Sequence, residues 1–216
     1  MPRCRYNSQD TRAKVIEVLK LIQQNNIQNT IYLLPNDREA FPDPKAPLLL
    51  GPVGRECHPE YLSYTDMSTA INALLKVLDD LHKIEWCHCD VRWPNVIRDV
   101  KLNKFVLIDF EYARKVGQDC PAIKNKFKHS KILETKKWYP FGDTYQVILM
   151  IQRWVCVYKN ISSTQRAQAN QLVESLKQQV QDDVKKSLQP SHVDSVVVTT
   201  AAVTAASTNT SKDAVI

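Results

Sequence analysis

The sequence predicts an α+β protein that is mainly helical and carries a few short strands. Two observations predict this class. Several segments place apolar residues at helical spacing, and short β-like runs lie between them, bounded by proline, glycine or asparagine. No run of about 18 apolar residues occurs, so a membrane-spanning helix is not expected.

Four helices are predicted, at 11–24, 66–83, 144–158 and 163–188. The second has the clearest apolar stripe, and the third is apolar nearly all round, which indicates a buried helix. The fourth is rich in glutamine and has a narrow stripe, which favours docking on the surface of the domain. That stripe consists of Leu172, Leu176, Val180, Val184 and Leu188.

Short strands are predicted at 31–34, 48–50, 95–98 and 104–108. The last two enclose D-V-K-L-N, which suits a hairpin turn. The segment 35–47 contains four prolines and predicts a loop, as does the basic stretch 112–140. From residue 190 onward the chain is a Ser/Thr/Val/Ala sequence of low complexity, which predicts a disordered tail.

Length and composition narrow the function classes. The 216 residues suit one domain plus a tail. Six scattered cysteines without C-x-x-C indicate reduced thiols in a cytoplasmic or nuclear protein. The net charge of +6 favours acidic partners only mildly, and nucleic acid is not the expected partner. With four glycines, the chain has neither G-x-G-x-x-G nor G-x-x-x-x-G-K-[ST].

The residues that carry chemistry lie in H-C-D-V-R-W-P-N at 88–95 and L-I-D-F-E at 107–111. A tight hairpin over 95–108 would bring Asn95 and Asp109 together, with Asp90 nearby. One amide and two carboxylates form a site of hard oxygen ligands, which magnesium prefers together with water and phosphate oxygens. Each of these residues is also a common turn former, so only their joint spacing favours a site.

This pattern resembles the catalytic half of the protein kinase fold, in which H-R-D-x-x-x-x-N is followed by D-F-G. The resemblance covers about 48–160. The segment L-L-L-G-P-V-G at 48–54 resembles the hinge that binds adenine, and a buried helix opening with Asp143 resembles the central helix whose acid braces the catalytic loop. D-V-R-W-P-N with L-I-D-F-E is similar to kinase-like domains of fungi and of oomycete crinkler effectors.

The resemblance implies a mainly helical C-lobe with a truncated, small N-lobe. The expected units are an N-lobe remnant at 1–50, the C-lobe at 51–160, a C-terminal helix at 161–188 and a disordered tail at 189–216. It implies a phosphotransferase that moves the ATP γ-phosphate to a hydroxyl, most often on a protein or peptide, with ATP and Mg²⁺ as cofactors.

The resemblance also implies roles for single residues. Asp90 would be the catalytic base, and Arg92 would steady the transferred phosphoryl group. Asn95 and Asp109 would hold the metal on the nucleotide phosphates. The nucleotide itself would lie against three further residues, Leu50 and Gly51 in the hinge and Ile97 beneath adenine.

The sequence departs from the kinase pattern in four places. No glycine-rich loop or V-A-I-K strand precedes the hinge, although Glu17 could serve as the helix glutamate; Lys14 is a poor candidate for the strand lysine. Cys89 replaces the arginine of H-R-D, Glu111 replaces the glycine of D-F-G, and no A-P-E follows.

Three alternatives therefore stay open. The first is a catalytically impaired pseudokinase or interaction module. The second is an effector that binds nucleic acid through the lysines and aromatic residues of 124–138. The third is a zinc site from Cys57-His58 and Cys87-His88-Cys89, whose spacing is too tight for the usual pattern.

Overall fold

The computed structural model describes residues 3–4, 9–34 and 48–189. The predicted proline-rich loop at 35–47 and the predicted tail from residue 190 onward lie outside the described residues. Within the described part, no helix is long and apolar enough to cross a membrane.

The four predicted helices are present with small shifts at their ends, and a fifth, short helix was not predicted. They are α1 (Gln9–Gln24), α2 (Tyr64–Lys83), α3 (Ser130–Thr135), α4 (Pro140–Val157) and α5 (Ser163–Ser187). α4 begins four residues before the predicted start, because proline is well suited to the first position of a helix. α3 lies inside the predicted basic loop 112–140, and its six residues are too few for a periodic pattern.

The strands form three small sheets. β1 (Arg3–Cys4), β3 (Leu48–Gly51) and β2 (Tyr32–Leu33) form one in that order, and β4 (Arg55–Glu56), β6 (Val96–Asp99) and β7 (Lys104–Leu107) form the second. β5 (Trp86–Cys87) pairs with β8 (Arg114–Lys115). The hairpin predicted from 95–108 is confirmed, with Val96 opposite Leu107.

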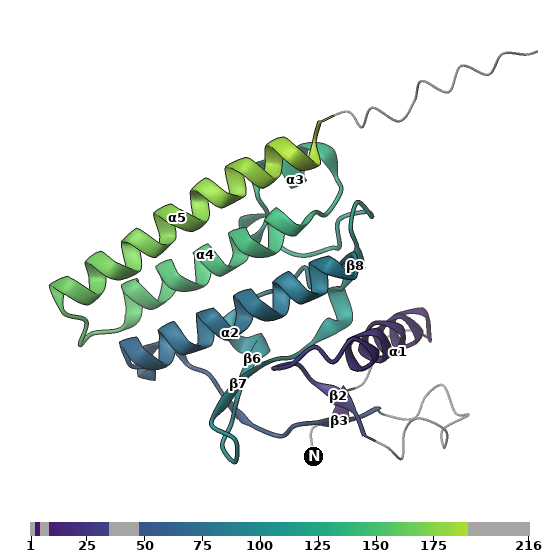
Figure 1. The fold of residues 1–216 in the computed structure, drawn as a ribbon, viewed down its shortest axis with the longest axis horizontal. Coiled ribbons are helices and arrows are strands. Elements are labelled where there is room, and N and C mark those ends of the chain that lie inside the picture. Colours follow the sequence, from purple (N-terminus) through teal and green to yellow (C-terminus); the bar gives the residue numbers. More distant parts are fainter. Residues whose placement is uncertain (1–2, 5–8, 35–47, 190–216) are drawn as a thin grey trace, which may run out of the picture.

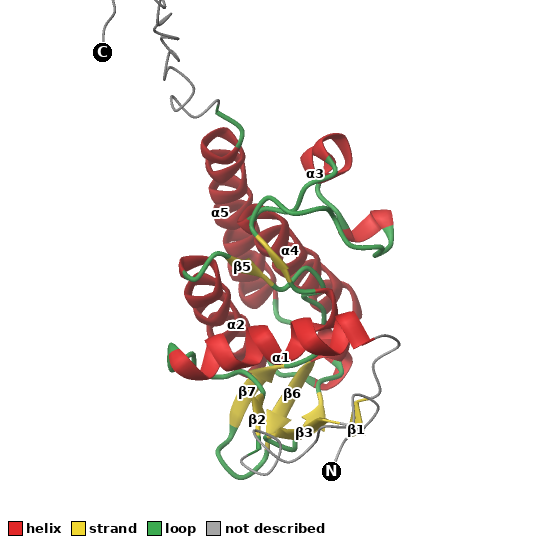
Figure 2. Ribbon diagram, turned by 90° about the vertical axis from the view of Figure 1, so that its right-hand side faces the viewer, coloured by secondary structure: helices red, strands yellow, loops and turns green. Residues whose placement is uncertain are grey.

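The larger part of the molecule is helical. Figure 1 shows α2, α4 and α5 side by side, with the β6–β7 hairpin beneath α2. α1 and the small sheet β1–β3–β2 lie at the other end (Figure 2). A parallel bridge between Thr30 and Leu107 joins the two parts.

The side of α5 that faces α4 differs from the predicted stripe. Its fully buried residues are Ala169, Val173, Leu176 and Val180. Their spacing of four, three and four follows the 3.6-residue period of a helix, whereas a strict repeat of four drifts around the helix axis. Leu176 and Val180 belong to both sets, and the helix docks on the domain as predicted.

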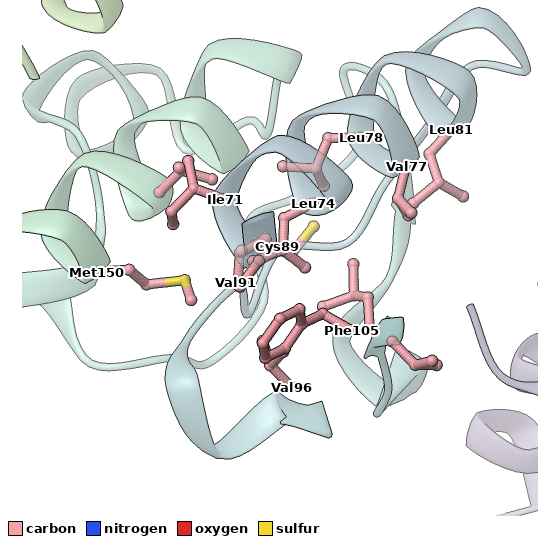
Figure 3. Close-up of a cluster of buried hydrophobic side chains, with 14 of the residues drawn as sticks. Ile71, Leu74, Val77, Leu78, Leu81, Cys89, Val91, Val96, Phe105 and Met150 are labelled. Carbon is pink, nitrogen blue, oxygen red and sulfur yellow. The ribbon is translucent and has the colours of Figure 1, made fainter. Parts of the chain in front are cut away.

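A buried hydrophobic cluster fixes the chain segment that carries the candidate site. Figure 3 shows Leu74 of α2 beside Val91, which follows Asp90 directly, with Ile71 and Leu78 of α2 in the same buried cluster. Val96 and Phe105 of the hairpin close the cluster from below. The loop at 88–95 is thus held between a long helix and a sheet, and its polar side chains are carried by a rigid frame.

Cysteine reactivity gives a direct check of this packing. Cys57, Cys87 and Cys89 are buried, and Cys156 is exposed. Burial raises the pKa of Cys57 to about 11 and raises the pKa values of the other two buried thiols as well. Because the thiolate is the reactive form, iodoacetamide at pH 8 should label Cys156 and spare the three buried thiols until the protein is unfolded. Peptide mass mapping measures this, and labelling of Cys89 in the folded protein would contradict the packing.

Candidate active site

Asp90, Arg92 and Asn95 meet in one hydrogen-bonded group. Asp90 lies in the turn after β5, and Asn95 ends a short 3₁₀ turn, Trp93–Asn95, that leads into β6. The Asn95 Nδ2 group donates to the Asp90 carbonyl oxygen and to its Oδ2, both at 2.8 Å. Arg92 Nε donates to the same Oδ2 at 2.9 Å.

These hydrogen bonds leave Oδ1 of Asp90 and Oδ1 of Asn95 available for other partners. Asp90 Oδ2 is occupied, and none of the described residues donates a hydrogen bond to its Oδ1. The Asn95 amide uses its nitrogen toward Asp90, which turns its Oδ1 the other way. A carboxylate oxygen that can accept a proton therefore lies beside an amide oxygen that can bind a cation.

The β6–β7 hairpin brings Asp109 close to Asn95. The Ile108 amide donates to the Asn95 carbonyl oxygen at 2.9 Å, so Asp109 is one residue beyond a direct backbone contact. Asp109 has left-handed backbone angles, φ 66° and ψ 73°. Its side chain accepts a long 3.4 Å bond from the Glu111 amide. Aspartate is among the non-glycine residues that adopt this left-handed region most readily.

The Asn95 Oδ1 atom and the Asp109 carboxylate are thus carried at the end of the hairpin, and few described residues donate hydrogen bonds to them. This donor set is the kind that magnesium takes when phosphate and water complete its shell. The residues present therefore fit the divalent ion that the sequence pattern implies.

His88 links the loop at 88–95 to the segment at 108–111, which contains Asp109. Its Nε2–H donates to the Ile108 carbonyl oxygen at 2.9 Å, and its Nδ1 accepts from the Asp90 amide at 3.3 Å. The ring packs edge-on against Phe110, with 4.8 Å between ring centroids. These contacts require the Nε2-protonated, neutral tautomer, so His88 holds the loop in place and is not placed as a base.

Asp143, in the first turn of α4, braces the loop from behind. Its Oδ2 accepts the His88 amide at 2.8 Å and His82 Nε2–H at 3.1 Å. Its Oδ1 accepts the Cys89 amide at 2.9 Å and Trp138 Nε1–H at 3.1 Å. Four donors thus surround a fully buried carboxylate.

The environment of Asp143 favours its charged form. Burial by itself raises the pKa of the Asp143 carboxyl, but the hydrogen bond and the charge of His82 and the Cys89 amide outweigh it, and the net pKa is lowered. At neutral pH the charged carboxylate therefore accepts hydrogen bonds from the two loop amides. His82 and Trp138 are contacts that the sequence analysis missed, because they lie outside the kinase motifs.

A zinc site at the clustered cysteines is not supported. Among the described residues, the His, Cys, Asp and Glu side chains close enough to share one ion are His82, Cys87 and Asp143, and Cys57-His58 is not part of that group. Both Asp143 oxygens already accept two hydrogen bonds each. A metal would have to displace these donors.

α1 docks directly on the Asp109 segment. Lys14 Nζ donates to the Glu111 carbonyl oxygen at 2.8 Å, and Glu17 forms a half-exposed ion pair with Lys115 at 3.2 Å. Burial and the nearby Arg114 lower the pKa of Lys14. Glu17 thus pairs with a lysine that follows Asp109, and the contact between Lys14 and the Glu111 backbone was not predicted from the sequence.

The three predicted adenine contacts lie on two strands. Leu50 and Gly51 are buried on β3, and Ile97 is buried on β6. The segment between them is tightly packed, since a Cβ added at Gly54 would come within 2.6 Å of the Arg98 carbonyl oxygen and 3.1 Å of Ile97 Cβ. The predicted hinge therefore belongs to the sheet of β1, β3 and β2 and approaches β6 only at its end, at Gly54.

Comparison with known proteins supports the fold. The protein has a protein kinase-like fold: the kinase PK-1 of Cydia pomonella granulovirus is similar in structure, with a TM-score of 0.53 and 18% sequence identity over 78% of this chain and 63% of that one. In sequence, a stretch of 75 residues, 35% of the chain, is 36% identical to Crinkler effector protein 8 of Phytophthora infestans. The matched stretch makes up 12% of that relative, and the chain spans less than two thirds of the viral kinase. No family model matches.

Proposed function

We propose that this protein is a phosphotransferase that moves the γ-phosphate of ATP to a hydroxyl group of a protein. The observation that carries the proposal is the group formed by Asp90 and Asn95, in which one carboxylate oxygen and one amide oxygen are left open next to Asp109. Phosphoryl transfer needs little covalent chemistry from a protein and depends on positioning and on charge.

The chain's own residues divide these tasks. Asp90 Oδ1 would accept the proton of the acceptor hydroxyl, while Arg92 and Asn95 keep the carboxylate in one orientation. Asn95 Oδ1 and the Asp109 carboxylate would hold Mg²⁺, which neutralises charge on the phosphates when it is bound. Leu50, Gly51 and Ile97 would form the adenine side of the site.

A second function, a pseudokinase that binds partners without transferring phosphate, is favoured by the contacts of α1. Lys14 is bound to a backbone carbonyl and Glu17 to Lys115. Glu17 therefore pairs with Lys115 on β8, which follows Asp109, and in the described part of the chain it pairs with no lysine that precedes the predicted hinge. Without a lysine from a strand that precedes the hinge, phosphate binding would depend on the proposed metal ligands and on Arg92.

Nucleotide binding separates these two functions. With Mg²⁺–ATP at about a hundred times its dissociation constant, the folded protein gains about 2.7 kcal/mol, which raises the melting temperature by several degrees. Asp109→Ala should remove this shift, because it deletes a proposed metal ligand. Thermal shift measurements with and without Mg²⁺ test this.

The matched control is Asp119→Asn, which changes an 88% exposed side chain and should leave the shift intact. A wild-type protein that shows no shift at millimolar Mg²⁺–ATP would reject the phosphotransferase and favour the interaction module.

A further inference from the structure

A cavity of about 350 Å³ lies at the end of the molecule that carries α1 and the small sheets. Its walls come from the last turns of α1 and the chain at 26–32, from β7 and the hairpin turn before it, and from Pro52 beside the predicted hinge. Figure 2 shows α1, β2 and β7 together at this end. None of the residues proposed for the active site lines the cavity, and its volume suits a small ligand.

Asp99, at the end of β6, is a buried carboxylate in this lining, with 5% of its surface exposed. Its Oδ1 accepts the backbone amides of Lys101 and Leu102 in the hairpin turn, at 2.9 and 3.3 Å. None of the residues that the structure describes donates a hydrogen bond to its Oδ2. Because a buried charged oxygen is unfavourable without a donor, Oδ2 favours a ligand that supplies one.

Lys104 does not neutralise Asp99, although the two residues are directly opposite each other on β7 and β6. No ion pair joins the two side chains, and Lys104 is exposed to solvent whereas Asp99 is buried. Water and salt screen an exposed ammonium far more than a buried carboxylate. Since the other lining residues are uncharged, a ligand inside the cavity meets a net negative charge.

Two glutamines in the lining add neutral acceptors to this charged one. Gln23 uses its Nε2 group toward the Leu33 carbonyl oxygen, and Gln28 uses its own toward Asn26. Their Oε1 atoms receive no hydrogen bond from the described part of the chain. Three such oxygens therefore line the cavity, and a protonated primary amine has three N–H donors and no acceptor.

Aromatic and apolar side chains form the rest of the cavity. Tyr32 packs on the predicted hinge, since a Cβ added at Gly51 would come within 2.9 Å of its ring, yet 42% of Tyr32 is exposed. Leu102, Val106 and Pro52 supply apolar surface. An aromatic ring attracts an organic cation, and apolar side chains bind a carbon body that a metal ion lacks.

We propose that this cavity binds an organic cation, namely a protonated primary amine on a short apolar or aromatic body. The ammonium group would donate to Asp99 Oδ2, and the body would lie against Tyr32 and Leu102. A free amine and a lysine side chain of another protein carry the same chemistry. The site is independent of the proposed phosphate transfer, because the two share no residue.

Titration of the whole ¹⁵N-labelled protein by nuclear magnetic resonance tests this site. The probes are phenethylamine, which is protonated at neutral pH, and its uncharged analogue phenethyl alcohol. The amine should bind about tenfold more tightly, because a charge-assisted hydrogen bond is stronger than a neutral one. The amide signals of Lys101 and Leu102 should shift, since both amides are bonded to Asp99. Shifts confined to residues outside the cavity would overturn the proposal.

Asp99→Asn should remove the tenfold preference, while the asparagine oxygen still accepts the two turn amides and keeps the turn folded. Gln28→Lys is a second variant at an exposed lining position, and its competing ammonium should also remove the preference. It decides the question if Asp99→Asn does not fold. Asp79→Asn is the matched control, because it makes the same change at a 67% exposed position outside the lining and should keep the preference.

A capped tripeptide with lysine between two alanines, compared with one that has norleucine there, distinguishes the two sources of the amine. Tighter binding of the lysine peptide assigns the site to a protein segment, whereas a preference shown by phenethylamine alone assigns it to a free amine. If neither charged probe binds more tightly than its uncharged analogue, the proposal is wrong. It is also wrong if the preference persists in folded Asp99→Asn.

Discussion

Asp90→Asn is expected to lower the rate of phosphate transfer about 10²- to 10⁴-fold, the usual contribution of a positioned general base. Asparagine has the same shape and keeps an oxygen that can accept the bonds from Asn95 and Arg92. It cannot take a proton from the acceptor hydroxyl. The measurement is γ-phosphate incorporation into the protein itself or a generic acceptor.

The same variant should keep the thermal shift with Mg²⁺–ATP, because Asp90 is not one of the two proposed metal ligands. Loss of transfer with retained nucleotide binding identifies Asp90 as the base. If wild type and variant both incorporate phosphate only at background level, the protein is not a kinase; equal incorporation above background would remove Asp90 from the mechanism.

Asp143→Asn is expected to cost about 3–5 kcal/mol of folding stability, the cost of breaking a buried charged group with its partners. The carboxylate accepts four hydrogen bonds, and asparagine would direct an NH₂ group at two of those donors. At about 2–4 °C per kcal/mol for a chain of this size, the melting temperature should fall by roughly 6–20 °C. Circular dichroism melts measure this.

The pH dependence gives a second check on Asp143. Its pKa is lowered in the folded protein, so the stability that the carboxylate contributes is present above the ordinary carboxyl pKa near 4. That contribution is lost as the pH falls through the lowered value. The difference in folding free energy between wild type and Asp143→Asn should therefore be largest at neutral pH and become smaller in acid.

Asp79→Asn is the control for this prediction. Asp79 is 67% exposed and pairs with Lys83 on the surface of α2, so its loss should change stability by less than about 0.5 kcal/mol. A stability change in Asp143→Asn as small as that of Asp79→Asn would show that the carboxylate does not hold the loop.

The sequence alone predicted the parts of the fold that have a clear period or motif. Local patterns predicted three elements that tertiary contacts did not override. They are α2, from its apolar stripe, α4, from its apolar residues on all sides, and the β6–β7 hairpin, from the two strand-like runs around D-V-K-L-N. The hairpin also predicted that Asn95 and Asp109 come together with Asp90 nearby, and the structure joins Asn95 to Ile108 and to Asp90 by hydrogen bonds.

Other features depend on contacts between distant residues. The short α3 carries too few apolar residues to show a period, and the buried side of α5 was set by packing against α4. Lys14 and Glu111 are 97 residues apart, and the four donors around Asp143 come from α2, the catalytic loop and the segment before α4.

The sequence by itself thus determined the four long helices and the hairpin, because local spacing specifies them. Only the tertiary structure decided which oxygen of Asp90 is free and where the basic loop lies relative to α4. The physical reason is that hydrogen-bond partners and cavity walls come from segments far apart in the chain, and their positions follow from packing of the whole domain.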